Sequence, residues 1–327
     1  ATGTDAPGPT TITPRYTDDS KNRVVATADP LGHVMRVEYD VRGFKTAEVD
    51  ANGNRTVFDY DTLGNLLRKT FADGTTEIST YDGENRRTSI TDRGGRTLLQ
   101  GYDALGHLTR VTLPDGAILQ KAYDHRGNLA REVDARGNAT TYEYDARNRK
   151  IATVDALGRR TTYGYDADGL QTTTTGPDGE VWRYEYDRRR HRTAVVRPDG
   201  QRRTWTYDIG GRQVTETDEA GNTTRFEYDV MDRLISVTDA LGNVTRHTYD
   251  ELGNRTSTTD ANGHTTRMTY DALKRVITRT LPRGQVEGLE YDAVGNIIRK
   301  VDFNGAEIHF VWDENNRLLE RAVVGGE

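Results

Sequence analysis

The chain has 327 residues, a formal net charge of −6 and a hydrophobic share of 34%, which is below that of most globular chains. Its 17 tyrosines and 33 glycines recur at regular positions, which is not typical of a disordered tract. The sequence has no cysteine, which excludes disulfides and thiol chemistry. No apolar run approaches the roughly 18 residues of a membrane-spanning helix, and the mild negative charge argues against general nucleic-acid binding.

We expect three segments along the chain. Residues 1–17, which open with ATGTDAPGPTTITP, carry no secretory signal and are predicted to form a linker or fragment edge. Residues 18–322 are predicted to form an array of about 14 repeats. Residues 323–327 are expected to form the C-terminal edge of that array.

The array is defined by a strict period of 21 residues. The pair Tyr-Asp occurs at every step from Tyr39 to Tyr291, and Trp312 takes the fourteenth place. A second series of 14 glycines runs at the same spacing from Gly32 to Gly305, with no insertion or deletion. We expect these positions to be structural, and we single out Tyr39, Asp40, Gly53, Tyr60, Asp61, Gly74, Tyr102, Asp103, Gly116, Tyr144, Asp145, Gly158, Tyr186, Asp187, Gly200, Tyr228, Asp229, Gly242, Tyr270, Asp271, Gly284, Trp312 and Asp313.

Each repeat carries two turn signals about ten residues apart. Most are written Asp-x-x-Gly, as in Asp50–Gly53 and Asp103–Gly106. Asp accepts bonds from backbone N–H groups ahead of it, and Gly supplies a positive φ at no steric cost. The segments between the turns are rich in Thr, Val, Ile and Tyr, and Tyr142 and Tyr144 are two residues apart, which places them on one face of a strand. Each repeat is therefore predicted to be a β-hairpin.

One hairpin is only marginally stable in water, so neighbouring hairpins must pair edge to edge. The predicted fold is all-β, with about 28 strands of tandem 21-residue hairpins in one continuous antiparallel sheet. Because twist accumulates in a sheet of this size, we expect it to wind into a spiral shell, barrel or superhelical ribbon. Tyrosines at equivalent positions are expected to stack as ladders between hairpins.

The strand register stays open at this stage. A three-residue loop pairs Asp50 with Asn54, whereas a four-residue loop gives Val49 that partner. The two alternatives place Leu66 and Leu67 on opposite faces of the sheet.

Two stretches, YDARNRKIATVDALGR and YDALGHLTRVTLPDG, resemble the YD repeats of the RHS (rearrangement hot spot) family. That family includes bacterial polymorphic toxins, the C component of insecticidal toxin complexes, wall-associated bacterial proteins and animal teneurins. The resemblance covers about Asn22 to Leu319 and implies a spiral of strands that forms a hollow shell. In the toxins, this shell holds a C-terminal effector domain until delivery. Their closing motif DPxGLxxGxNxYxY, with its autoproteolytic aspartates, is missing here, so autocleavage is not carried over.

The function that we expect from the resemblance is a non-catalytic scaffold, namely the shell wall that encapsulates an effector domain of a bacterial secreted or polymorphic toxin. The alternative is an extracellular adhesion or fibre-forming surface module. We predict no enzyme activity, cofactor or metal. The expected partners are the encapsulated effector or neighbouring repeats, with a surface glycan or protein as a further possibility, and the expected location is secreted or on the bacterial cell surface.

One local departure from the repeat is the cationic stretch DRRRHR at Asp187–Arg192. Its Arg190 stands where the turn glycine is usual, and Arg188, Arg189 and Arg192 add charge. A solvated hairpin tip is the simpler interpretation, and contact with an anionic cargo, lipid headgroup or glycan is the alternative. None of the seven histidines lies at metal-ligand spacing to another.

The glycine series leads to a test of the predicted turns. If Gly137 and Gly158 have positive φ, Gly→Val at either position will cost more stability than Gly→Ala in a strand interior. Thermal melts of the variants measure this difference. Equal tolerance of both kinds of change would show that the turns are misplaced.

Overall fold

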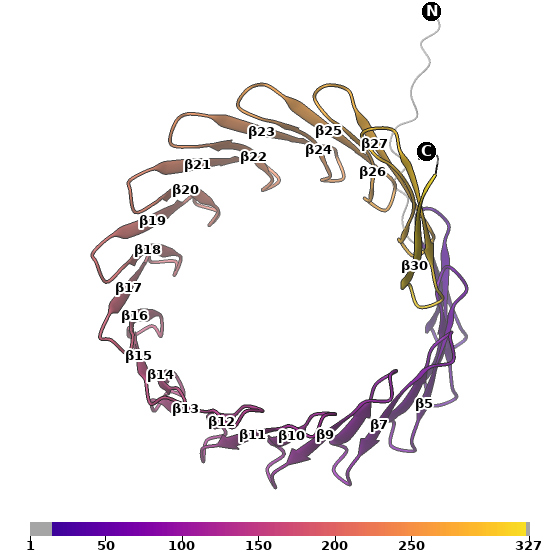
Figure 1. Cartoon of the computed structure of the whole chain (residues 1–327), viewed down its shortest axis with the longest axis horizontal. Coiled ribbons are helices and arrows are strands. Elements are labelled where there is room, and N and C mark those ends of the chain that lie inside the picture. The colour runs from indigo at the N-terminus through magenta and orange to yellow at the C-terminus, as the bar shows by residue number, and fades with distance from the viewer. Residues whose placement is uncertain (1–14, 325–327) are drawn as a thin grey trace, which may run out of the picture. The chain divides into compact units, whose positions relative to one another are not determined.

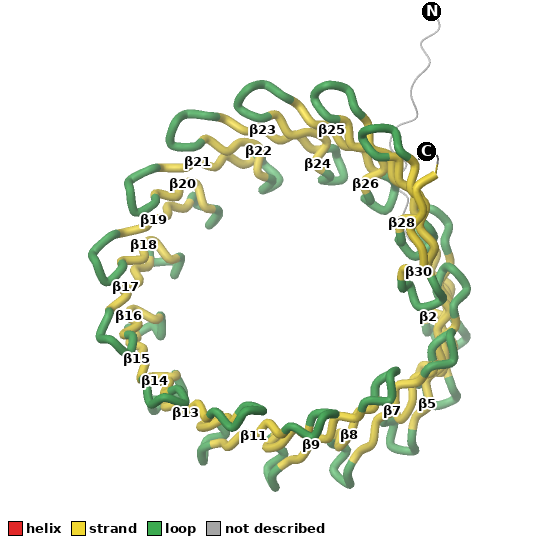
Figure 2. Tube along the Cα trace, viewed as in Figure 1, coloured by secondary structure: helices red, strands yellow, loops and turns green. Residues whose placement is uncertain are grey.

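The structure is a computed structural model that describes residues 15–324, and every regular element in this range is a β-strand (Figures 1 and 2). The 30 strands belong to one antiparallel sheet. The predicted all-β array with one hairpin per 21 residues is therefore confirmed. No helix in residues 15–324 is long and apolar enough to cross a membrane.

Strands alternate between two kinds. Strands of the first kind end at the Tyr of a Tyr-Asp pair or at the equivalent position, and they mostly have six residues. Strands of the second kind follow the turn that begins with the Asp, and they mostly have five residues. The first kind comprises β1 (Arg15–Asp18), β3 (Val34–Tyr39), β5 (Arg55–Tyr60), β7 (Thr76–Tyr81), β9 (Thr97–Tyr102), β11 (Ile118–Tyr123), β13 (Ala139–Tyr144), β15 (Arg160–Tyr165), β17 (Val181–Tyr186), β19 (Arg202–Tyr207), β21 (Thr223–Tyr228), β23 (Val244–Tyr249), β25 (Thr265–Tyr270), β27 (Val286–Tyr291) and β29 (Glu307–Trp312). The second kind comprises β2 (Val24–Ala28), β4 (Lys45–Val49), β6 (Leu66–Thr70), β8 (Arg87–Thr91), β10 (Leu108–Thr112), β12 (Leu129–Val133), β14 (Lys150–Val154), β16 (Gln171–Thr175), β18 (Arg192–Val196), β20 (Gln213–Thr217), β22 (Leu234–Thr238), β24 (Arg255–Thr259), β26 (Val276–Thr280), β28 (Ile297–Val301) and β30 (Leu318–Val324).

The structure has one hairpin more than the sequence predicts. The added pair, β1 and β2, turns through Asp19–Arg23 and has Asp18 where later repeats have Tyr, so a search for Tyr-Asp misses it. Its turn sequence DSKNR is close to DGENR at Asp82–Arg86, and that likeness could have revealed it. The predicted linker lies mostly outside the described residues, and β1 takes up its last three residues.

Two five-residue turns join the strands, and both close in the same way. In the Tyr-Asp turn Asp145–Arg149, the N–H of Asp145 donates to the carbonyl of Arg149 at 2.9 Å, and the N–H of Asn148 donates to the carbonyl of Asp145 at 3.1 Å. In the turn at residues 134–138, which we call a glycine turn, the corresponding distances are both 3.0 Å. Each loop therefore has three residues, and the first of the two registers is the one adopted. The two kinds of turn lie at opposite ends of the strands (Figure 2).

The fourth residue of each turn has left-handed backbone geometry. Gly137 and Gly158 have φ values of 86° and 77°, and the other glycines of the strict series also have positive φ. This geometry is that of a type I turn followed by a left-handed residue, which is common in three-residue hairpin loops. In the Tyr-Asp turns, the same position holds either Gly or one of Asn22, Asn85, Asn148, Arg190, Asp232, Lys274 and Asn316.

A β-bulge follows thirteen turns of the Tyr-Asp kind. Tyr144 pairs with Lys150, but Glu143 pairs with Ala152, so Ile151 is an extra residue in its strand. The equivalent bulge pairs Tyr60 with Leu66, which places Leu66 on the face that carries the tyrosines. Leu67 occupies the bulge position. The bulge residue Thr88 bonds Thr80 at 2.8 Å, which places this position on the opposite face. We call these two surfaces the Tyr face and the polar face.

In most repeats, the tyrosine hydroxyl ties the hairpin to the one before it. Tyr144 Oη donates to the carbonyl of Leu129, fifteen residues back at the preceding bulge, at 2.9 Å. The indole nitrogen of Trp312 makes the same bond to Ile297 at 2.8 Å, so Trp replaces Tyr without loss of the contact. The same contact is made by Tyr39, Tyr102, Tyr123, Tyr165, Tyr186, Tyr207, Tyr228, Tyr270 and Tyr291.

Few side chains are fully shielded from water. Ala47, Ala152 and Ala194 have no exposed surface, while Phe58 and Ile308 are 8% and 6% exposed. The sheet therefore has no continuous hydrophobic core, and its stability comes from contacts between neighbouring strands, as in other one-dimensional arrays.

The chain forms two compact units, one of residues 80–247 and 260–262 and the other of the remaining residues. Within the second of these units, early glycine turns contact late Tyr-Asp turns. The Asn52 amide donates to the carboxylate of Asp292 at 3.0 Å, and Arg317 forms an ion pair with Asp73 at 3.1 Å. Both contacts join residues about 240 positions apart in the sequence, so they add non-local links to an otherwise local fold.

The hydroxyl contact predicts the result of Tyr144→Phe. Removing the oxygen leaves the Leu129 carbonyl without this donor and should cost about 1 kcal/mol of unfolding free energy. Urea titration measures the loss. Tyr60→Phe is the matched control, because in residues 15–324 the Tyr60 hydroxyl makes no such bond to the preceding hairpin. Equal losses in the two variants would show that the hydroxyl contact does not stabilise the array.

Candidate functional site

The Tyr-Asp turn uses both oxygens of its aspartate. Asp145 Oδ1 accepts the backbone N–H groups of Arg147 and Arg149 at 2.8 and 3.0 Å, and Oδ2 accepts Arg149 Nε at 2.7 Å. Asp61 repeats the pattern with Asn65 as the side-chain donor. The carboxylate therefore holds the turn together, which explains why Asp recurs at this position.

The fifth residue of the Tyr-Asp turn connects one repeat to the next. Arg149 bonds its own Asp145, donates to the carbonyl of Asp166 at 3.1 Å, and lies 4.8 Å from the ring centre of Tyr165. The tyrosines thus stack on this turn residue, and the predicted ladder of tyrosine on tyrosine is wrong for the ring contacts within residues 15–324. The same three contacts are made by Arg23, Arg86, Arg212 and Arg275.

Histidine fills the same role in two repeats. His107 bonds Asp103 at 3.0 Å and stacks on Tyr123 with ring centres 4.6 Å apart. His191 bonds Asp187 at 2.9 Å and stacks on Tyr207 at 4.7 Å. These histidines therefore have a structural explanation. Across residues 15–324, no three His, Asp or Glu side chains are grouped so that they could hold a metal ion.

The polar face carries ion pairs that join residues on two strands across the strand that lies between them. Arg160 donates from both terminal nitrogens to Glu143, one of these bonds at 2.7 Å, and the pair spans the intervening strand above Ala152. The completely buried side chain of Ala152 follows from this cover. The same arrangement occurs with Glu38 and Arg55 above Ala47, and with Glu185 and Arg202 above Ala194.

Where the middle strand has no alanine, other polar pairs replace the bridge. Arg299 contacts Glu290 on one side and Glu307 on the other, each at 2.6 Å. Hydrogen bonds from Arg299 and then His309 lower the pKa of Glu307 to about 2. In four other hairpins two hydroxyls meet within 2.6–2.7 Å, namely Thr80 with Ser89, Thr206 with Thr215, Thr248 with Ser257 and Thr269 with Thr278. Part of the polar groups of this face thus pair with one another, while arginines such as Arg131 and Arg225 on the same face are exposed.

In the cationic turn at Asp187–Arg192, three of the arginines contact neighbouring groups and one is exposed. Arg189 donates to the carbonyl of Ile209, and Arg190, with φ of 72°, donates to the carbonyl of Asp168 at 3.4 Å. Arg192 lies 5.0 Å from the ring centre of Tyr184. Arg188 is exposed at the tip of the turn. The turn places these four arginines at one end of strands β17 and β18. Contact with an anion stays a prediction.

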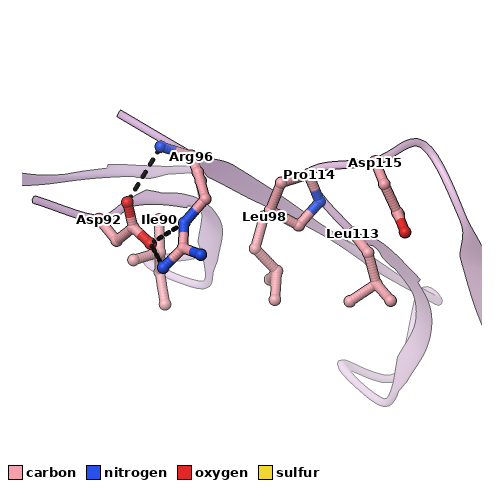
Figure 3. A pocket seen from close by; sticks show the side chains of 7 residues that line it. All are labelled: Ile90, Asp92, Arg96, Leu98, Leu113, Pro114 and Asp115. Carbon is pink, nitrogen blue, oxygen red and sulfur yellow. Dashed lines mark hydrogen bonds and ion pairs between the residues drawn. The ribbon is translucent and has the colours of Figure 1, made fainter. Parts of the chain in front are cut away.

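An apolar groove of about 520 Å³ lies between two glycine turns (Figure 3). Ile90, Leu98 and Leu113 line it, and the Asp92–Arg96 ion pair flanks one end. It is an open depression on the sheet, without converging polar groups of the kind that a catalytic site requires. Sequence analysis did not single out these residues, because their side chains are ordinary strand residues of the repeat.

The fold and its contacts define a class of protein, the tandem β-hairpin repeat proteins. The model of the RHS Repeat family matches residues 39–76, 60–97, 81–118, 102–139, 123–160, 150–181, 165–202, 190–223, 210–244, 232–265 and 249–286. The chain belongs to the RHS repeat family. Comparison with curated proteins gives no match.

Solved structures with a similar fold are larger than this chain. A crystal structure of TcdB2-TccC3-Cdc42 matches 94% of this chain and 19% of its own, with a TM-score of 0.79 and 17% identity. Structures of TcdB2-TccC3-TEV and of TcdB2-TccC3 without its hypervariable C-terminal region match 94% of this chain and 22% of theirs, with TM-scores of 0.63 and 0.59 and identities of 16% and 15%. At these identities the likeness concerns the fold, and this chain spans about a fifth of their length.

The aspartate turns predict how stability depends on pH. Backbone N–H groups are the largest cause that lowers the pKa of Asp145, Asp82 and Asp229, against an opposing effect of desolvation. A folded-state pKa below the unfolded one gives stability that is complete above the unfolded pKa of about 4 and is lost as pH falls through the folded pKa. Thermal melts from neutral to acidic pH should show a falling Tm below about pH 4. A Tm that does not change in this range would contradict the assigned role of the carboxylates.

Proposed function

We propose that this chain is the non-catalytic wall of a shell that encloses the C-terminal effector domain of a bacterial secreted or polymorphic toxin. Membership of the RHS repeat family and the fold likeness to TcdB2-TccC3 structures support a toxin-associated repeat scaffold. Residues 18–322 form the wall in this proposal. The partners are the enclosed effector and neighbouring repeats of the same protein, and the protein acts in a secreted form or at the cell surface.

The observation that carries the proposal is the mutual pairing on the polar face. A partly unfolded cargo exposes apolar side chains, so a containing wall must not offer it a large apolar patch. Bridges such as Glu143 with Arg160, and hydroxyl pairs such as Thr206 with Thr215, keep this face predominantly polar. The polar face is therefore the one that meets the cargo.

Containment in this mechanism is a property of the continuous sheet. Most hairpins contribute the hydroxyl contact, the turn carboxylate and polar pairs of one kind or another, so in this proposal no single side chain outside the turns carries the function. The sheet keeps the cargo in by its unbroken ladder of backbone hydrogen bonds. An interruption of that ladder is the change that should open it.

The test is protease protection of an effector or reporter domain placed after the array in the natural full-length protein. Tyr144→Pro puts proline in a strand that is paired on both sides, and it should make the enclosed domain sensitive to protease. Ala135→Pro is the matched control, because the equivalent position of the preceding repeat is already proline, at Pro114. This control should leave protection intact.

A different pattern of results would contradict the proposal. If Tyr144→Pro preserves protection while a change of His191 to Ala abolishes it, a discrete binding site holds the cargo. If the wild-type protein gives no protection at all, the array does not enclose its neighbour.

A further inference from the structure

The Tyr face carries a row of aromatic side chains that the wall function does not use. Tyr142, Tyr163, Tyr184 and Trp205 stand two residues before the Tyr of the Tyr-Asp pair in the four successive hairpins from β13 to β20. Because strand residues two apart share a face, these side chains lie on the Tyr face, and we call them the ring row. Each is half-buried, so part of each ring reaches solvent.

A row of hydrogen-bond donors accompanies the ring row. Lys150, Gln171, Arg192 and Gln213 each pair in register with the Tyr of their own Tyr-Asp hairpin, which places them on the same face, and we call them the donor row. Gln171 uses one of its two N–H groups on Thr174, at 2.7 Å, and keeps the other. The hairpins before and after these four have leucine at this position, so the two rows coincide in the same four hairpins.

The side chains of the ring row follow the period of the hairpins. The Tyr163 hydroxyl lies 3.3 Å from Thr153 Oγ1, and the Tyr184 hydroxyl lies 3.2 Å from Thr174 Oγ1, in each case on the preceding strand. Successive tyrosines therefore lean in the same direction. Within the described part of the chain, the Trp205 indole N–H donates to no other group, so it stays available to a ligand.

The spacing of the two rows fits one kind of peptide conformation. Successive hairpins are two strand spacings of about 4.8 Å apart, which gives roughly 9.6 Å between equivalent rings. A polyproline II helix has three residues per turn and rises 3.1 Å per residue, so it returns to the same face about every 9.3 Å. An extended strand returns about every 6.7 Å, and two turns of an α-helix take about 10.8 Å. Over four hairpins only the polyproline II helix stays in register to within about 1 Å.

The donor row carries positive charge that the chain does not neutralise. Lys150 lies over the rings of Tyr142 and Tyr163, and Arg192 lies 5.0 Å from the ring centre of Tyr184. In residues 15–324, no carboxylate lies within ion-pair distance of either cation. The two cations are two hairpins apart, roughly 19 Å, and six residues of a polyproline II helix span about the same distance.

The carboxylates beside the ring row are already engaged. Glu132 accepts the Tyr142 hydroxyl. Glu216, which pairs with Trp205 in the strand register, forms an ion pair with Arg203 at 3.4 Å. The charge of the donor row therefore favours a ligand that brings its own acidic groups.

We propose that the ring row and the donor row together bind a proline-rich segment of a partner protein, in the polyproline II conformation and with acidic residues at every third position. Aromatic grooves are the usual docking surface for such segments. Trp205, Tyr186 and Tyr207 line a groove of about 400 Å³ in which a proline ring packs between aromatic side chains. The ligand backbone has no internal hydrogen bonds, so its carbonyls accept from the Gln213 amide and the Trp205 indole. The proposal does not rest on the wall function, because both rows lie opposite the polar face.

Isothermal titration of the full chain with a capped peptide of four Pro-Pro-Glu units tests the proposal. This peptide is about 37 Å long as a polyproline II helix, so it reaches all four hairpins. We expect saturable binding, weaker binding of four Pro-Pro-Gln units because the charge is lost, and no binding of four Gly-Gly-Glu units because the prolines are lost.

Two variants separate the ring row from general stability. Trp205→Leu, which introduces the residue found at Leu289 in the equivalent position, should weaken binding at least tenfold, or about 1.4 kcal/mol. Phe310→Leu is the matched control, because Phe310 stands at the ring position of a hairpin whose donor position holds Leu318. Its binding should not change, and thermal melts should show that both variants are folded.

A third variant tests the charge of the donor row. Lys150→Gln combined with Arg192→Gln keeps hydrogen-bond donors at both positions and removes both charges. The Pro-Pro-Glu and Pro-Pro-Gln peptides should then bind this variant equally, because the preference for the acidic peptide comes from these two cations.

Four results would overturn the proposal. The first is no saturable binding of the Pro-Pro-Glu peptide to the wild-type chain. The second is equal binding of the Gly-Gly-Glu peptide, or unchanged binding by Trp205→Leu, since either would leave only attraction between charges. The third is tighter binding of an oligothymidylate of twelve nucleotides, which would assign the rings to single-stranded nucleic acid. The fourth is a dimer of the free chain that Trp205→Leu separates, which would assign both rows to a second copy.

Discussion

The bond from a tyrosine hydroxyl to the carbonyl of the preceding bulge is the contact on which the rest of this structure depends. A bulge removes one backbone group from the ladder, and a buried group without a partner is costly. The Tyr144 hydroxyl supplies that partner to Leu129 from the next hairpin. Local geometry at one turn thereby becomes a link between repeats, and a hairpin that is marginal alone becomes part of a stable array.

This dependence explains why the period has no insertions. The hydroxyl must reach a carbonyl fifteen residues earlier, and the fifth turn residue must reach the next tyrosine sixteen residues later. Arg149 and His107 meet the second requirement with different chemistry, since one offers a guanidinium and the other an imidazole ring. The array therefore tolerates variation in side chains but not in length.

The sequence predicted the repeating elements well, and it predicted the contacts between them less well. Hairpin boundaries, left-handed glycines such as Gly137 and the all-strand composition of residues 15–324 followed from turn chemistry and period-two patterning. The stacking partner of the tyrosines was predicted wrongly, because equivalent residues of neighbouring repeats lie two strands apart with one strand between them, whereas the fifth turn residue lies close to the ring. The groove lined by Ile90, Leu98 and Leu113 could not be found from the sequence, since its residues come from separate strands and are ordinary members of the repeat.

What the sequence by itself determined is the repeat unit: a strict period, two turns and the alternation of residues along each strand, all of which are set by interactions within about five residues. Only the tertiary structure decided which face each aliphatic side chain occupies, because Leu66 and Leu67 are assigned by a bulge that depends on the loop length and on the neighbouring strand. It also decided which charges are paired. Glu143 and Arg160 are 17 residues apart in the sequence and meet across the intervening strand β14. Arg190 and Arg192, by contrast, have no carboxylate within ion-pair distance in the described residues. Such pairings depend on register and not on sequence distance.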